Sequence, residues 1–165
     1  PLGNRGYLMR PGMMPPDFGE VKYVPSHKLK FSYFGGLTSE RNLGIFTSAL
    51  SRLLKERPEL KAVLEVHQYG GEMDKVSREG FKQLPDSILV PHGRLETDPA
   101  TGKNGRQRVL EQMRQSDVLI LMHGEGDIKE ICQLYIPSKI YEYLWAQRPV
   151  LLFSPLPLAC AKWCR

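Results

Sequence analysis

The chain has 165 residues, of which 41% are apolar and 25% are charged, with 23 lysines and arginines against 18 aspartates and glutamates. This length supports one compact domain, and the composition excludes disorder, collagen and coiled coil as descriptions of the whole. The net charge of +5 permits anionic ligands without indicating nucleic acid. Because no apolar run approaches the roughly 20 residues of a membrane span and no secretory leader opens the chain, we expect a cytoplasmic protein.

The two ends of the chain differ from its middle. Residues 1–28 are rich in proline, glycine and methionine and show no sustained periodicity, so we interpret them as a linker or tail from a preceding domain. Residues 29–165 are the predicted folded domain. Three cysteines, Cys132, Cys160 and Cys164, cannot all pair and lack zinc-site spacing, which is typical of free thiols in a reducing compartment.

From residue 29 onward, short apolar stretches alternate with longer amphipathic ones. The short stretches predict five strands, at residues 31–34, 62–67, 87–91, 118–122 and 150–153. The amphipathic stretches predict helices at residues 41–55, 75–84, 107–115 and 137–147. Strands that alternate with helices, and interior strands that are apolar throughout, indicate an α/β fold with a Rossmann-like, doubly wound parallel sheet. Ligands of such sheets bind at the carboxyl ends of the strands.

Two of the predicted helices carry specific expectations. In the helix over 41–55, six apolar residues make up one broad face: Ile45, Phe46, Ala49, Leu50, Leu53 and Leu54. Ser39 is its predicted N-cap, since a serine hydroxyl accepts a hydrogen bond from a first-turn amide. In the helix over 107–115, Leu110 and Met113 are expected to point inward.

The first segment that can carry chemistry is residues 33–42, a strand that runs through Gly35 and Gly36 into a helix start. Glycines let a phosphate approach the backbone, and a helix N-terminus offers unpaired amides. Arg41 in the first turn would add a bidentate contact to a diphosphate. The alternative is a tight turn with an exposed arginine.

The second segment is residues 136–150. On a helix, Ser138, Lys139 and Glu142 share one flank near the N-terminus. The carboxylate there can accept ribose hydroxyls while the ammonium group meets phosphate. The alternative is an ordinary surface lysine–glutamate pair.

Read together, the two segments and residues 116–120 resemble a known family. The pattern Y-x-G-x-L-x-x-x-R-N begins at residue 33, S-D-V-L-I at residue 116, and P-S-K-x-x-E-Y-x-x-x-x-R-P-V-L at residue 137. In this order they resemble the C-terminal donor-binding domain of retaining GT-B glycosyltransferases of group 1, family 4. The match covers roughly residues 29 to 154.

The resemblance implies a hexosyltransferase whose donor is a nucleotide-diphosphate sugar. It assigns the ribose to Glu142 and the charge of the leaving diphosphate to two catalytic cations, Arg41 and Lys139. The remaining implied donor-binding residues are Gly35, Gly36, Gly93, Arg94, His123, Gly124 and Ser138. The family is typically metal-independent, so the resemblance implies no cofactor. The acceptor would bind a separate N-terminal domain, so this chain alone is expected to be inactive.

Two positions depart from the family pattern. Many members carry a second glutamate eight residues before the ribose-binding one, and that position is Leu134 here. Many also carry arginine directly after the first-strand glycine, where this chain has Gly36. Ser138 and Lys139 are expected to compensate.

Three histidines form a further candidate group. His67, His92 and His123 each fall at or beyond the predicted end of a different strand, which predicts that they share one edge of the sheet. There they would line the donor site, bind a metal or supply a base. The alternative is three solvated loop histidines.

Other interpretations of the sequence stay open. Lysines and arginines between residues 22 and 61 are interpreted as solvated faces, because acidic residues lie among them and no aromatic platform for nucleic acid accompanies them. Peripheral membrane contact through the full-length enzyme stays open. A GT-B epimerase would use the same donor contacts, and a non-catalytic flavodoxin-like module that binds a protein would share the fold.

Overall fold

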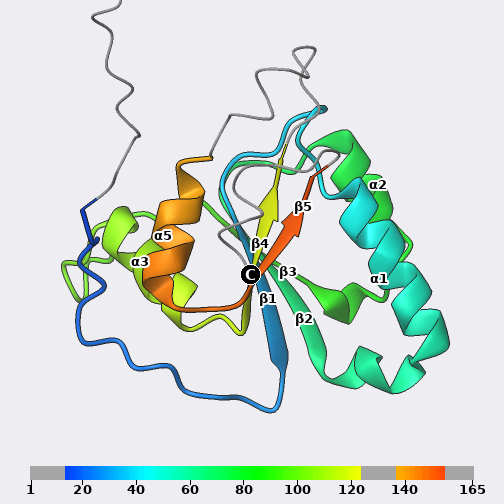
Figure 1. Ribbon diagram of the computed structural model, residues 1–165, viewed down its shortest axis with the longest axis horizontal. Coiled ribbons are helices and arrows are strands. Elements are labelled where there is room, and N and C mark those ends of the chain that lie inside the picture. Colours follow the sequence, from blue (N-terminus) through cyan, green and yellow to red (C-terminus); the bar gives the residue numbers. More distant parts are fainter. Residues whose placement is uncertain (1–13, 124–136, 155–165) are drawn as a thin grey trace, which may run out of the picture.

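The computed structural model describes residues 14–123 and 137–154, and its centre is a five-stranded sheet (Figure 1). In chain order the strands are β1 (Leu29–Phe34), β2 (Leu64–Tyr69), β3 (Leu89–Gly93), β4 (Val118–Met122) and β5 (Val150–Phe153). Across the sheet the order is β3-β2-β1-β4-β5, and all neighbouring strands are parallel. The predicted doubly wound, Rossmann-like sheet is confirmed.

Helices cover both faces of the sheet. The described α-helices are α1 (Gly44–Glu56), α2 (Lys75–Lys82), α3 (Gly105–Arg114) and α5 (Lys139–Ala146), and short 3-10 helices form at η1 (Pro58–Ala62) and η2 (Asp86–Ile88). α1 and α2 lie on one face, and α3 and α5 lie on the other (Figure 1). The chain runs outward from β1 to β3 and then crosses to β4 on the other side of β1. The switch point, where such folds bind ligands, therefore lies at the carboxyl ends of the neighbouring strands β1 and β4.

Each face of the sheet has its own apolar core. Toward α1 and α2 the buried side chains include Tyr33, Phe46, Leu50, Val66, Phe81 and Ile120. Toward α3 and α5 they include Phe34, Tyr69, Leu110, Met113, Leu119, Ile140 and Tyr143. Neighbouring residues of one strand point to opposite faces, so Tyr33 and Phe34 enter different cores. The inward positions predicted for Leu110 and Met113 are confirmed.

The start of α1 differs from the prediction. The helix begins at Gly44, and Ser39 does not cap it. Two other side chains bind the amides at this end: Asn42 Oδ1 accepts from Gly44 N at 2.9 Å, and Ser77 Oγ of α2 accepts from Leu43 N at 2.8 Å. A side chain from 34 residues further along therefore helps decide where the helix begins.

The apolar face of α1 is narrower than predicted. Phe46, Leu50 and Leu54 are buried, whereas Ile45 is 60% exposed and Leu53 is 39% exposed. One flank of the helix contacts the sheet and α2, and the other flank lies in solvent. Among the helices that the structure describes, none has the length and apolar character needed to cross a bilayer.

β2 and β3 each lie two residues further along the chain than predicted. Residue 62 belongs to the η1 turn, and residues 87 and 88 belong to η2, so both strands begin later. Both also extend further at their carboxyl ends. Tyr69 at the end of β2 stacks on Phe34, with ring centroids 4.7 Å apart and an angle of 5° between the rings.

Residues 14–28 form no helix or strand, as their composition predicts, yet they are fastened to the domain. Phe18 departs from the expectation of a segment outside the core: it is buried beside α3, with the Arg114 guanidinium 4.6 Å from its ring centre. Tyr23 donates a hydrogen bond from its hydroxyl to Asp117. This segment therefore covers part of the α3 and α5 layer.

Candidate functional site

A hollow lies at the switch point, at the carboxyl ends of β1 and β4. Its volume is about 140 Å³. It is lined by Tyr33, Phe34, Gly35, Gly36, Arg41, Leu121, Met122, Pro137, Ser138, Lys139 and Tyr143. Residues from the two segments singled out in the sequence therefore meet in one place, although about a hundred residues separate them.

A second, larger hollow adjoins the first. It has a volume of about 560 Å³, and it shares Phe34, Gly35 and Lys139 with the first hollow. Its other lining residues are Tyr69, Gly70, Arg94, Leu95, Glu96, Thr97, Asn104, Gly105, Arg106 and Val109. We call the two adjoining hollows together the crevice. It runs from the loop before α1, past the end of β1, to the N-terminus of α3.

Glycines allow the tight backbone turns at the centre of the crevice. Gly35 has φ of +130° and Gly70 has φ of +148°, a region that favours glycine. A Cβ atom on Gly70 would lie 2.2 Å from the carbonyl oxygen of Gly35, so these turns touch backbone to backbone. Gly36 has no heavy atom within 4 Å of the position of a Cβ, and its carbonyl accepts from the Tyr33 hydroxyl at 3.0 Å. The turn after β1 is therefore fixed by the Tyr33 hydroxyl, while the space beside the Cα atom of Gly36 is open.

Arg41 lies in the loop before α1 and not in the first helical turn, because the helix begins three residues later than predicted. Thr38 holds this loop: its backbone N–H donates to the carbonyl of Arg41 at 3.0 Å, and its hydroxyl accepts from the Arg41 backbone N–H at 3.1 Å. The fixed turn places the arginine on the wall of the first hollow. Burial raises the pKa of Tyr33 on the same wall, and Arg41 opposes that rise.

The N-terminus of α5 forms another part of the wall of the first hollow. Ser138 is its N-cap residue, and its side chain makes no capping hydrogen bond. The amide of Ile140 donates to the carbonyl of Pro137 at 2.9 Å, which tightens the first turn. Lys139 lines both hollows. An anion in the first hollow would therefore lie between Arg41 and Lys139.

Glu142 lines neither hollow; it is only 13% exposed and lies beside Lys139, which lines both. Its Oε1 lies 2.8 Å from Nη1 of Arg106, and its Oε2 lies 3.4 Å from Nζ of Lys139. Oε2 is covered and accepts no hydrogen bond from the part of the chain that the structure describes. Each oxygen of the Glu142 carboxylate therefore faces one of the two cations.

The turn after β3 borders the second hollow. Gly93 has φ of +65°, and its carbonyl accepts from the backbone N–H of Gly70 at 2.8 Å. Arg94, the next residue, lines the hollow, and its side chain is 85% exposed. Its Nε atom lies 3.9 Å from Oε1 of Glu96. The turns after β1, β2 and β3 are thus joined in a row at the edge of the crevice.

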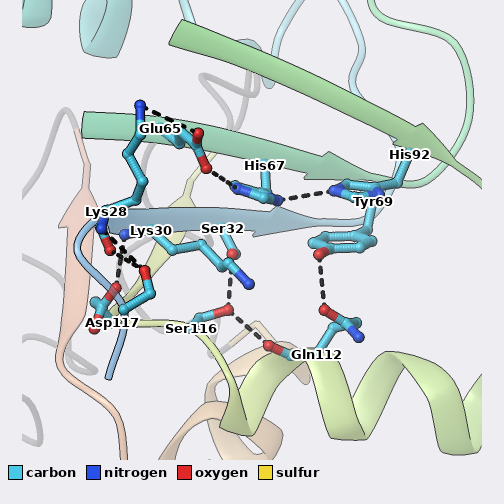
Figure 2. A network of polar contacts seen from close by, with 11 residues as sticks. Lys28, Lys30, Ser32, Glu65, His67, Tyr69, His92, Gln112, Ser116 and Asp117 are labelled. Carbon is cyan, nitrogen blue, oxygen red and sulfur yellow. Dashed lines mark hydrogen bonds and ion pairs between the residues drawn. The ribbon is translucent and has the colours of Figure 1, made fainter. Parts of the chain in front are cut away.

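The three histidines do not share one edge as predicted. His67 and His92 lie within β2 and β3, because both strands extend beyond their predicted ends, and His123 directly follows β4. Figure 2 shows a chain of contacts from Glu65 through His67 to His92. Nε2 of His67 lies 3.1 Å from the Glu65 carboxylate, and its Nδ1 lies 2.8 Å from Nε2 of His92.

The protonation of this pair follows from its surroundings. Burial lowers the pKa of His67, although Glu65 opposes the shift. Burial also lowers the pKa of His92, helped by the charge that His67 carries when it is protonated and by the charge of Lys30. Neutral His67 that donates from Nε2 to the Glu65 carboxylate must accept at Nδ1, so a neutral His92 donates from Nε2 and its Nδ1 is an acceptor.

Neither histidine of this pair lines the crevice, and neither does the buried His123. Gly124, Leu134 and the three cysteines lie outside the described residues. Within residues 14–123 and 137–154, no three side chains of histidine, cysteine, aspartate or glutamate come together as a metal site.

The structure adds one charged residue that the sequence reading missed, Arg106. It follows Asn104, which caps α3 in a reciprocal pair with Gln107 at 3.0 Å in both directions. A cation in the first turn of a helix opposes the helix dipole, which favours anions there. That unfavourable placement, two residues after a capping residue, was the available signal in the sequence.

The sequence matches no protein-family model, and it matches no curated protein at a significant level. Solved structures are similar in fold. One is the α,α-trehalose 6-phosphate synthase of Burkholderia multivorans, with a TM-score of 0.50 and 15% identity over 76% of this chain. Another is TarM, with a TM-score of 0.50 and 12% identity over 90% of this chain.

Both neighbours are glycosyltransferases of GT-B architecture. This chain covers 28% of the length of the first and 26% of the second. At these identities the likeness extends to the fold, a Rossmann-like sheet of the kind found in GT-B half-domains.

Proposed function

We propose that this chain is the nucleotide-sugar-binding domain of a retaining glycosyltransferase. The observation that carries the proposal is the crevice at the switch point. Arg41 and Lys139 both line its first hollow, and a nearly buried carboxylate, Glu142, lies 3.4 Å from the ammonium group of Lys139. Such a constellation fits a ligand with a doubly charged diphosphate next to a sugar that carries two hydroxyls.

The proposed binding mode follows the crevice. The diphosphate occupies the first hollow, between Arg41, Lys139 and the open backbone at Gly36. The ribose lies toward Glu142. The base extends into the second hollow, whose volume of about 560 Å³ suits a planar ring.

The proposed chemistry is electrostatic. As the bond between sugar and diphosphate opens, negative charge grows on the leaving group, and fixed cations at that position lower the barrier. Arg41 and Lys139 supply this charge, so the proposal requires no resident metal. The acceptor and the remainder of the sugar pocket belong to a second domain, and this chain alone is expected to bind donor without transferring its sugar.

Calorimetric titration with UDP, GDP and ADP tests the proposal. We expect saturable binding of at least one of them, and we expect Glu142→Ala to weaken it. Arg52→Ala is the matched control, because Arg52 is an exposed residue of α1 and lies in neither hollow. If the parent protein binds none of the three nucleotides, or if Glu142→Ala binds as well as the parent, the proposed function is wrong.

A further inference from the structure

Glu142 is held by an ion pair that crosses between two helices. Arg106 extends from the first turn of α3 and Glu142 from the first turn of α5, and these helices lie side by side on one face of the sheet (Figure 1). The 2.8 Å contact from Nη1 to Oε1 has the length of a charge-assisted hydrogen bond. The contact from Lys139 to Oε2, at 3.4 Å, is longer than such a bond.

The two cations therefore hold the carboxylate unequally. Lys139 lines both hollows and is 30% exposed, so a diphosphate in the crevice competes directly for its ammonium group. When that group turns to phosphate, Oε2 of Glu142 loses its only cation among the described residues and becomes available as an acceptor. Arg106 lines only the second hollow, away from the diphosphate, so its contact with Oε1 is not in direct competition with phosphate.

On this basis we propose that Arg106 is a positioning residue for ribose recognition. It fixes the Glu142 carboxylate so that Oε2 faces the ribose hydroxyls after Lys139 has moved to the diphosphate. This inference rests on the proposed function, because it assigns the ribose to Glu142.

The proposal also explains the position of Arg106. A guanidinium in the first turn of α3 opposes the helix dipole, and its side chain is 47% exposed, so the ion pair contributes little to folding. Without Arg106, Lys139 would be the only cation left beside a nearly buried carboxylate. The carboxylate would then lose the contact that fixes its orientation.

The test compares nucleotides with and without ribose hydroxyls. The probes are whichever of UDP, GDP and ADP binds the parent, and its 2′,3′-dideoxy analogue, titrated into the parent and into Arg106→Ala, Arg106→Lys and Glu142→Ala. We expect Arg106→Ala to weaken the ribonucleotide about tenfold, the size of one hydrogen bond to a charged group. The dideoxy analogue should change less than twofold.

Two further results are expected. Arg106→Lys should recover part of the affinity, because one donor to Oε1 returns. Adding Arg106→Ala to Glu142→Ala should have no further effect, since the residue acts through the carboxylate. Arg52→Ala controls for the lost charge, and thermal unfolding confirms that every variant is folded.

Contrary outcomes are distinguishable. Equal weakening of both nucleotides by Arg106→Ala would show that Arg106 contacts the diphosphate itself, and no change in either would show an ordinary surface ion pair; each overturns the positioning role while the proposed function stands. Failure of the parent to bind any of the three nucleotides overturns both proposals.

Discussion

The Nδ1 atom of His67 in β2 lies 2.8 Å from the Nε2 atom of His92 in β3, in two rings inclined by only 19°. The Tyr69 ring is parallel to the His92 ring, with centroids 4.2 Å apart. Among the described residues, Glu65 contacts His67 and is itself paired with Lys28, the charge of Lys30 acts on both histidines, and Gln112 of α3 accepts from the Tyr69 hydroxyl (Figure 2). A polar network thus joins three strands and a helix on one face of the sheet.

This network predicts that stability falls at acidic pH. The pKa of each histidine is lowered from its ordinary value of about 6.5, so the unfolded chain binds protons that the folded protein excludes. The free energy of unfolding should therefore be greatest above pH 6.5 and decrease as the pH falls through the region below it. Urea denaturation at pH 7.5, 6.5 and 5.5 measures the decrease.

His92→Phe isolates the contribution of the pair, because phenylalanine keeps a ring against Tyr69 and removes a titrating group. We expect a shallower pH dependence in this variant than in the parent. His27→Phe, at an exposed position of the segment before β1, is the control. An unchanged pH dependence in His92→Phe would contradict the prediction.

Asp117 is predicted to hold the segment before β1 in place. Its Oδ2 accepts from the backbone N–H of Lys30 at 2.7 Å, and its Oδ1 accepts from the Tyr23 hydroxyl. Asp117→Ala leaves a part-buried amide without this acceptor, so we expect a loss of about 1–3 kcal/mol in the free energy of unfolding. Urea denaturation at neutral pH measures it.

Tyr23→Phe separates the two contacts of Asp117, because it removes the hydroxyl and keeps the ring beneath the Arg148 guanidinium. It should cost less than Asp117→Ala. If the two variants lose the same stability, the hydrogen bond from the Lys30 amide contributes nothing, and the prediction that Asp117 holds this segment through both contacts is wrong.

Gly70 is predicted to tolerate no side chain. Its φ of +148° is strained for any other residue, and a Cβ would meet the Gly35 carbonyl at 2.2 Å. Both are backbone features that cannot rotate away, so Gly70→Ala should cost about 1–3 kcal/mol or more. Gly71→Ala is the neighbouring control, because nothing lies within 4 Å of its Cβ position. Equal stabilities of the two variants would argue against this backbone contact.

Arg41 is predicted to distinguish phosphates from nucleosides. Since it lies on the wall of the first hollow and away from the second, Arg41→Ala should weaken a nucleoside diphosphate about tenfold, the effect of losing one charge-assisted contact. The corresponding nucleoside should change little. Calorimetry with both ligands, with Arg52→Ala as the control, provides the measurement. Equal losses for both ligands would remove Arg41 from the phosphate site.

The sequence predicted the sheet well where burial leaves little choice. The strands at 118–122 and 150–153 were predicted to the residue, because each is a short, continuous apolar run with polar or turn-forming residues on both sides. β2 and β3 were displaced by two residues, since residues 62 and 87 entered 3-10 turns. The energies that separate a turn from a first strand residue are too small for a local pattern to decide.

In the site, the sequence by itself identified Gly35, Arg41 and Lys139, and their meeting in one hollow follows from the strand order once the sheet is doubly wound. Only the tertiary structure decided what surrounds Glu142. Its partner Arg106 lies 36 positions earlier on another helix, and such a pairing depends on how α3 and α5 pack. The pairing of His67 with His92 likewise depends on the register of β2 and β3. Local spacing sets which face a side chain takes, whereas distances across elements arise from the packing of the whole chain.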